Sequence, residues 1–273
     1  MSELSLAGSR FRARRRSVDR FIGVACAAIA ATTFIGLLVA VVLTVGRGLA
    51  DIGGVLARKD QAFAEALWGS ASIALTATLF SVVIGVGTTI YMCEIAGNPI
   101  VARRFVAVAR ALAALPAVVF GIIGMQLVML VETHYLVVAT MTLSLLALPR
   151  IIVNTRDALN KVPVSARMAS YALGATPWRT MRDHILPVAV RNIASGVFAT
   201  VGRTFGATAP LVMLAAVTPM PATLPTEAVH AILFGDRTNS ELAGAVIAVI
   251  VMIHAVVTFF ASQLQRRFEV VRL

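Results

Sequence analysis

The chain has 273 residues, of which 59% are hydrophobic and 14% are charged. This balance excludes a large soluble domain and predicts an all-α polytopic membrane protein. The net charge of +11 would suggest nucleic acid in a soluble chain, but the basic residues here lie between apolar segments. The orientation rule for membrane proteins explains them, so no nucleic-acid partner is expected.

Residues 1–20 contain six arginines and almost no apolar side chain, which predicts a basic, disordered cytoplasmic tail. The next segment, 21–45, runs for 25 residues without a charge. A signal peptide has an apolar region of roughly 7–15 residues. We therefore expect 21–45 to be the first transmembrane helix.

Five more segments are long enough to span a bilayer, which takes about 20 apolar residues. They are 68–92, 112–131, 135–153, 190–216 and 242–262, followed by a short tail at 264–273. The gap at 132–134 is so short that the third and fourth spans should form an antiparallel hairpin. The sequence thus predicts six transmembrane helices.

The distribution of lysine and arginine predicts the orientation. With a cytoplasmic N-terminus, 19 of these residues lie in inside segments and four in outside segments. We therefore expect a multi-pass protein of the cytoplasmic (inner) membrane with both termini in the cytoplasm.

The connecting segments also carry patterns. Residues 94–111 read as a basic amphipathic helix along the inner membrane surface, and 46–67 as a helical segment at the outer interface. Residues 217–240 contain three prolines and are expected to be a loop with stiff turns. Small-residue faces for helix packing are expected at Gly85 and Gly87, Gly121 and Gly124, and Gly202 and Gly206.

A polar stretch at 162–187 predicts two short helices joined by a sharp turn. Pro163 suits the start of the first helix, and Gly174 suits its end, because glycine takes the left-handed conformation of a helix C-cap. Thr176 and Pro177 are typical N-cap and first-turn residues of the second helix.

Pro187 is expected to end that second helix. We expect the outer faces of the pair to carry Arg167, Arg179, Arg182 and Asp183, and apolar contacts to come from Met168, Tyr171, Leu173, Trp178, Met181 and Ile185. A helix pair this short cannot form its own core, so it should dock on a partner. The alternative is a solvated loop between spans.

This stretch resembles the cytoplasmic coupling loop of ABC importer permeases, whose pattern is roughly E-A-A-x3-G-x9-I-x-L-P. The positions in register are Ala169, Ser170, Gly174, Leu186 and Pro187. Met168 replaces the usual acidic residue and His184 the usual aliphatic one. The resemblance implies that the loop inserts into a separate ATPase, through Arg167, Met168, Ala169, Ser170, Gly174, Ala175, Trp178, Leu186 and Pro187.

Arg203 is expected near the middle of the fifth span, where a charge costs on the order of 2.5–3.5 kcal/mol on insertion scales. Arginine cannot lose its proton to avoid this cost, and no acidic residue lies one helical turn away. A water-filled path, backbone carbonyls or an anion must stabilise it.

Thr200, Thr204 and Thr208 form a hydroxyl stripe beside Arg203, which would suit an oxyanion path. Alternatively, these hydroxyls bond back to their own helix.

The segment GRTFGATAPL is similar to the G-R-x-x-G-E-T-A-P-L segment of PstA-type phosphate permeases, and LPAVVFGIIG at 115–124 is similar to another of their segments. The resemblance implies that Arg203 is the membrane arginine of that family. Ala207 stands where the family has glutamate. Without that acid, Arg203 should attract an anion more strongly.

No ATP-binding loop, catalytic triad or metal-ligand spacing occurs, and Cys26 and Cys93 are expected to be buried thiols. We expect no cofactor and no metal in this chain, which is not an enzyme by itself; the resemblance implies that a partner ATPase binds ATP and Mg.

The resemblance implies a type I ABC importer permease fold with cytoplasmic coupling helices and a transmembrane domain at 66–263. The chain would form half of a pore for inorganic phosphate. Its implied partners are an ATP-binding cassette ATPase dimer, a homologous second permease, an extracytoplasmic phosphate-binding protein and membrane lipid. Open alternatives are a permease for another oxyanion (phosphonate, sulfate or molybdate), a carrier or channel without an ATPase, and a non-transporting scaffold or sensor.

Overall fold

The computed structural model describes residues 30–36, 38–50, 52–53, 61–130, 134–218, 222–234 and 237–269. Every regular element in these ranges is helical, as the apolar composition predicts. The expected tail at 1–20 and the beginning of the first span lie outside the described residues.

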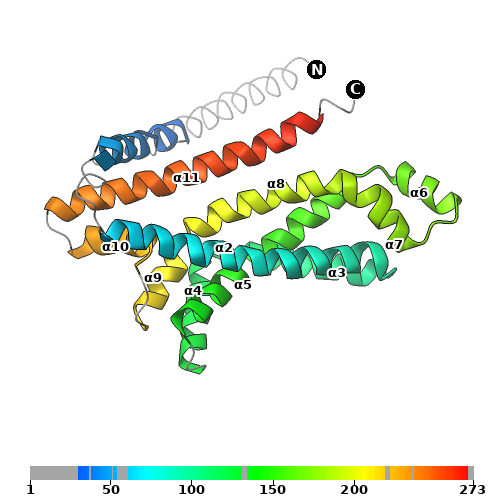
Figure 1. Cartoon of the computed structure of the whole chain (residues 1–273), viewed down its shortest axis with the longest axis horizontal. Helices are drawn as coiled ribbons and strands as arrows, with labels where there is room; N and C mark the ends of the chain where they lie inside the picture. Colours follow the sequence, from blue (N-terminus) through cyan, green and yellow to red (C-terminus); the bar gives the residue numbers. More distant parts are fainter. Residues whose placement is uncertain are drawn as a thin grey trace, which may run out of the picture.

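Five long helices are apolar enough to cross a membrane. They are Ala30–Ala50, α2 (Gln61–Ile90), α5 (Tyr135–Asn160), the helical stretch containing α8 (Leu186–Phe205), and α11 (Arg237–Glu269). Figure 1 shows α2, α8 and α11 extending along the long direction of the molecule. α2 packs against α5, and α8 packs against α5 and α11. This bundle agrees with the predicted fold class.

The expected third span, 112–131, contains a helix that is shorter than expected, and the helix expected at 94–111 precedes it. Residues Pro99–Ala113 (α3) and Ala117–Leu130 (α4) are separate helices that meet at a bend of 93°. Pro116 lies in the break, where it lacks the N–H that a continuous helix needs. If the bent pair counts as one span, the described residues contain six spans.

One face of α3, which was expected to lie along the inner membrane surface, packs on the protein. Ala102, Val106 and Ala109 are buried in α3, and the helix contacts α5. Asn98 caps its N-terminus by accepting hydrogen bonds from two backbone N–H groups. Contact with α5 therefore accounts for the buried positions of its amphipathic pattern.

The fifth span also has different bounds. It begins at Pro177, in α7 (Pro177–Thr180), and continues through a π-helical turn (η2, Met181–Ile185) into α8, which ends at Phe205. The expectation that Pro187 ends a helix is therefore wrong. Pro187 lies in the first turn of α8, where proline is tolerated. Residues Thr208–Ala215 form a separate short helix, α9.

The expected loop at 217–240 contains a helix, α10 (Leu224–Phe234). Its proline, Pro225, lies in the first turn, which is compatible with a helix. The Ser70 hydroxyl of α2 accepts a hydrogen bond from the Leu224 N–H at 2.8 Å. α10 also packs on α11, so tertiary contacts stabilise it.

Several expected small-residue faces are confirmed. A side chain at Gly121 would meet Pro210 and Met213 of α9, and one at Gly124 would meet Thr142 of α5. Gly202 and Gly206 face α11, and Gly85 faces α5. Gly87 has nothing within 4 Å.

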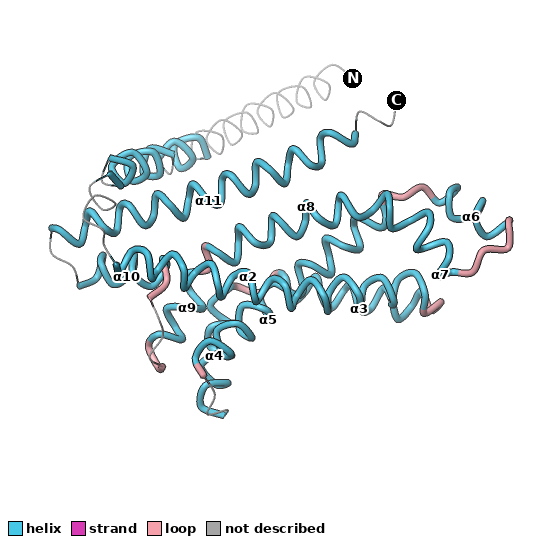
Figure 2. Tube along the Cα trace, in the orientation of Figure 1, coloured by secondary structure: helices cyan, strands magenta, loops and turns pink. Residues whose placement is uncertain are grey.

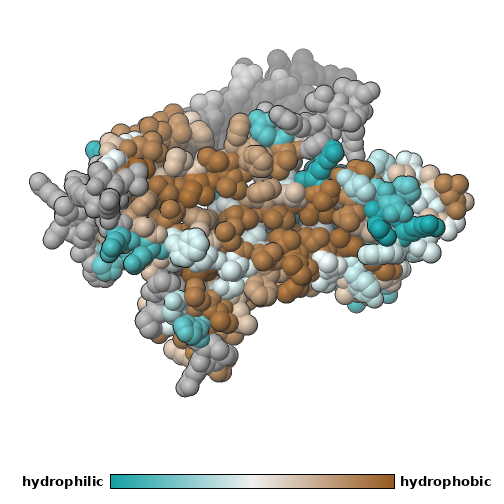
Figure 3. All heavy atoms as spheres, viewed as in Figure 1, coloured by the Kyte–Doolittle hydropathy of each residue, from teal (hydrophilic) through white to brown (hydrophobic). Residues whose placement is uncertain are grey.

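Apolar side chains cover much of the bundle surface in the view of Figure 3, and hydrophilic residues gather at the end that carries α6 and α7. At this same end, Figure 2 shows the loops that flank α6 (Val164–Ala172). The distribution agrees with an apolar belt through a membrane and a polar loop outside it.

Candidate functional site

A polar cavity of about 400 Å³ lies where the α3–α4 bend, the middle of α5 and the α8–α9 break come together. Its lining residues are Ala113, Ala114, Leu115, Pro116, Ala117, Leu146, Arg150, Arg203, Gly206, Ala207 and Thr208. The cavity exists because the α3–α4 segment and the α8–α9 segment both interrupt their helices at this level.

Two guanidinium groups line this cavity. Arg150 comes from the interior of α5 and is half-buried. Arg203 lies in the last turn of α8, lines the cavity and is exposed. Each guanidinium group carries a positive charge. None of the described residues that line the cavity is acidic. An anion would balance this charge.

Backbone groups add to the positive potential. α4 begins at Ala117 and α9 begins at Thr208, and both residues line the cavity. The first turn of a helix has unpaired N–H groups and the positive end of the helix dipole, so it favours anions. Two helix N-termini and two arginines therefore meet at one polar space.

The position of Arg203 differs from the expectation. It lies two residues from the end of the helix at Phe205, not in the middle of a span. Arg150 was only counted among the 19 basic residues of the inside segments, and its place in the cavity was not predicted. A signal was available, because the expected span 135–153 contains Arg150 between the apolar stretches LSLLALP and IIV.

The expected threonine stripe does not form one surface. Thr200 donates to the Gly196 carbonyl at 2.8 Å, and Thr204 donates to the Val201 carbonyl at 2.9 Å. Both are buried, and Thr204 also contacts the Thr78 hydroxyl of α2 at 3.2 Å. Only Thr208 of the three lines the cavity. The other two hydroxyls bond back to carbonyls of their own helix, as in the alternative interpretation. Thr208 is separated from them because α8 ends at Phe205.

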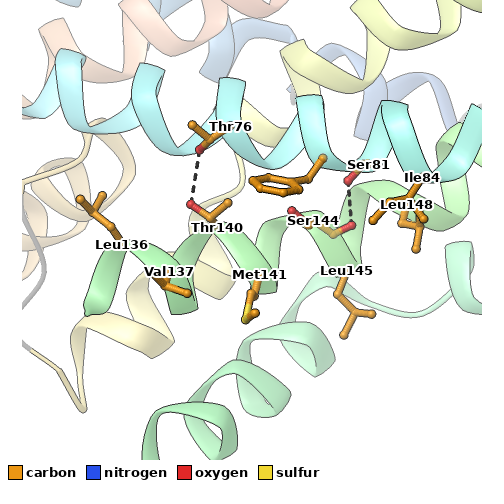
Figure 4. Close-up of a pocket in the computed structure, with 11 residues that line it drawn as sticks. Thr76, Ser81, Ile84, Leu136, Val137, Thr140, Met141, Ser144, Leu145 and Leu148 are labelled. Atoms are coloured by element: carbon orange, nitrogen blue, oxygen red, sulfur yellow. Dashed lines mark hydrogen bonds between the residues drawn. The ribbon is translucent and has the colours of Figure 1, made fainter. Parts of the chain in front are cut away.

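A second, larger cavity of about 510 Å³ lies in the groove between α2 and α5. Figure 4 shows the bond between the Thr76 and Thr140 hydroxyls and the bond between Ser81 and Ser144. The first is 3.3 Å long, and in the second the Ser81 hydroxyl donates to the Ser144 carbonyl at 3.0 Å. The other lining residues are apolar, among them Phe80, Ile84, Leu136, Val137, Met141, Leu145 and Leu148. The hydroxyls are used in helix contacts, so this groove offers no charge to an anion.

The polar loop at 162–187 has the predicted local geometry. The first helix, α6, begins after Pro163, and Gly174 has a φ of 80°, in the left-handed region. Thr176 accepts a hydrogen bond from the Arg179 N–H at 3.3 Å, and Pro177 begins α7. Ser170 and Thr180 share a buried hydrogen bond of 2.9 Å that joins the two helices.

The predicted coupling residues differ in exposure. Met168, Ala169, Gly174, Trp178 and Pro187 are exposed; Ala175, Leu186 and Arg167 are intermediate; and Ser170 is buried. Leu173 is 88% exposed. Met181 and Ile185 are buried against the end of α5 in a cluster that includes Leu159. One side of the loop therefore packs on the bundle, and the other presents apolar side chains.

Arg167 was expected on the outer face, but its side chain points into the molecule and is 17% exposed. It pairs with Glu94, which lies in a π-helical turn (η1, Tyr91–Ile95) at the end of α2. Arg156 of α5 approaches the other carboxylate oxygen of Glu94 at 3.6 Å. We refer to Glu94, Arg156 and Arg167 as the Glu94 cluster. The sequence reasoning missed this cluster, because its members are far apart in the chain.

Comparisons with known proteins agree with this architecture. A sequence profile described as "Binding-protein-dependent transport system inner membrane component" matches residues 81–270, more than half of the chain. "Probable ABC transporter permease protein YqgI" of Bacillus subtilis (strain 168) is 30% identical over 207 residues, which are 71% of this chain and 68% of that protein.

The phosphate transport system permease protein PstA of Mycobacterium leprae (strain TN) is 32% identical over 152 residues, which are 55% of this chain and 50% of that protein. The chain thus spans about half the length of this relative. Among solved structures, the MetNI methionine ABC transporter in an inward-facing conformation matches with a TM-score of 0.60 and 21% identity, over 74% of this chain and 94% of that chain. This likeness concerns the fold.

Proposed function

The chain belongs to the family of binding-protein-dependent transport system inner membrane components, and from this premise we propose that it is the permease subunit of an ATP-driven phosphate importer. It forms half of a translocation pore, together with a homologous second permease. An ATP-binding cassette ATPase dimer drives the pore, and an extracytoplasmic binding protein delivers phosphate to it. The similarity to PstA proteins supports phosphate as the anion.

The single observation that carries the proposal is the pair of arginines in the polar cavity. Arg150 and Arg203 come from two different helices and line the same space, with no acid among the described lining residues. Guanidinium groups bind oxyanions through charge-assisted, often bidentate, hydrogen bonds. In this role the two side chains stabilise the oxyanion during its passage through the membrane.

Energy enters through the loop at 162–187. Its exposed side chains, among them Met168, Leu173 and Trp178, form an apolar surface at the hydrophilic end of the molecule. Aromatic and aliphatic anchors of this kind suit the groove of a partner protein. We assign this surface to the ATPase, which binds ATP and Mg and transmits its closure to the helices that carry the arginines.

Reconstituted complexes test the proposal through phosphate uptake and phosphate-dependent ATP hydrolysis. Arg203→Gln and Arg150→Gln should each reduce phosphate uptake at least tenfold while assembly is retained, because each removes one of the two charges that stabilise the anion. Arg103→Gln is the control, since Arg103 is exposed on α3 and does not line the cavity. Native uptake in both cavity variants would refute the role of the arginines.

The same assay separates the other hypotheses. Uptake of sulfate, molybdate or a phosphonate in place of phosphate would identify another oxyanion permease, because arginines and hydroxyls alone do not specify phosphate. A fully assembled complex without any anion flux would favour a non-transporting scaffold or sensor. Flux without an ATPase would indicate a carrier or channel.

A further inference from the structure

Glu94 lies in an unusual position for an acidic residue. Its side chain is 4% exposed, and it sits at the end of α2, beyond the long apolar part of that helix. Arg167 pairs with one carboxylate oxygen. The other oxygen, Oε1, has no hydrogen-bond partner and lies 3.6 Å from Nη1 of Arg156. A buried carboxylate without a cation would be strongly disfavoured, so these arginines and Glu94 depend on one another.

Arg167 contacts two different spans at once. Its Nη1 pairs with Glu94 at the end of α2, and its Nη2 donates to the Leu159 carbonyl at 2.7 Å. Leu159 is in the last turn of α5, and its carbonyl also accepts a hydrogen bond from the Val162 N–H. One side chain of α6 is thereby attached to both α2 and α5.

Apart from residues 161–163, which join it to α5, α6 has few other attachments to the bundle. Ser170 is its one fully buried residue, and the Ser170–Thr180 hydrogen bond joins α6 to α7 rather than to a span. The packed contacts of α6 are chiefly with α7 and η2. The Glu94 cluster is therefore the main polar link from the first coupling helix to α2 and α5.

The second coupling helix has a different connection. α7 continues through η2 into α8 without a break, so Pro177–Phe205 is one helical stretch of 29 residues. At about 1.5 Å per residue it is about 43 Å long. Movement of α7 would be passed along this stretch toward Arg203. α5, which carries Arg150, is instead joined to α6, through residues 161–163 and through the Arg167 hydrogen bond to the Leu159 carbonyl.

We infer that Glu94 is a positioning residue that couples α6 to α2 and α5, so that movement of the first coupling helix reaches α2 and the helix that carries Arg150. This inference rests on the proposed function, because it assumes that an ATPase moves the loop. Neither Glu94 nor Arg167 touches the polar cavity. Their effect on transport is exerted through the position of the helices.

The first test measures the coupling ratio, which is the amount of phosphate transported per ATP hydrolysed by the reconstituted complex. Glu94→Gln and Arg167→Gln should each lower this ratio at least tenfold, while ATP hydrolysis itself continues, because movement of α6 is then no longer passed through the Glu94 cluster to α2 and α5. The double variant should be no worse than either single variant, since both remove the same contact. Asp157→Asn is the control: it removes an exposed ion pair with Arg110 at the same end of α5.

A second test does not depend on transport or on the ATPase. Spin labels at Leu173→Cys, on the exposed loop, and Tyr91→Cys, in η1, report the distance between the loop and the end of α2. Both native cysteines are replaced by serine. The distance distribution should be narrow with native Glu94 and at least twice as wide in Glu94→Gln, and the Asp157→Asn control should stay narrow.

The two tests separate the inference from the proposed function. If the native complex transports phosphate and Glu94→Gln retains the native coupling ratio, the inference is wrong and the proposed function stands. If the native complex transports no anion, the proposed function fails, and the distance measurement still tests the link between α6 and α2. An unchanged distance distribution in Glu94→Gln would overturn that link. Should Glu94→Gln fail to assemble, Arg167→Gln provides the same comparison from the other partner.

Discussion

Ala207 offers the most informative single substitution, because it lines the polar cavity beside Arg203 and carries no charge. Ala207→Glu introduces a carboxylate into a space that holds two guanidinium groups. Related phosphate permeases have glutamate at this position, according to the resemblance of the GRTFGATAPL segment. We expect the new carboxylate to compete with the anion for the arginines.

The size of the effect can be worked out from the charges. Opposite charges about 4–6 Å apart at an effective dielectric constant of about 20 attract by about 3–4 kcal/mol. Part of this is lost because the new carboxylate must itself leave water; Ala207 is only 8% exposed. We therefore expect a net loss of about 1.4–2.8 kcal/mol in the binding free energy of phosphate, which is a 10- to 100-fold weaker affinity.

Phosphate binding to the solubilised complex measures this affinity, and phosphate-dependent ATP hydrolysis reports whether release becomes faster. Ala207→Gln is the matched control, because glutamine has nearly the same shape without the charge. Equal affinities for the glutamate and glutamine variants would refute the electrostatic reasoning. Hydrolysis that appears only in Ala207→Glu would mean that the native cavity holds its anion too tightly for phosphate transport.

Two further predictions concern the coupling loop and the packing of the helices. Gly174→Ala should destabilise the turn between α6 and α7 by about 1–2 kcal/mol, because Gly174 has a φ of 80°, in the left-handed region that alanine disfavours. The expected result is a lower melting temperature and weaker binding of the ATPase. Gly196→Ala should cost about 1–3 kcal/mol, because its new Cβ would lie 2.8 Å from the Asn154 Cβ across the α5–α8 contact. Gly87→Ala is the control for thermal unfolding, since Gly87 has nothing within 4 Å, and an equal loss in both alanine variants would contradict the packing argument.

Local features of the coupling loop could be predicted from the sequence. Gly174, Thr176 and Pro177 each have a backbone preference that acts within a few residues, and the structure agrees with all three. The number and approximate position of the apolar spans were also predictable, because length and hydropathy decide whether a segment can cross a membrane. Family membership followed from the same segments, through short motifs at fixed spacing.

The sequence by itself thus determined the class of the protein, the spans and the turn of the loop, since these depend on local preferences and on composition. Only the tertiary structure showed where the helices break and which distant residues meet. Arg150 and Arg203 are 53 positions apart, and Glu94 and Arg167 are 73 apart. No periodicity connects such pairs, because their proximity results from how α2, α5, α6 and α8 pack. Both the cavity and the Glu94 cluster therefore arise from helix packing rather than from any single segment.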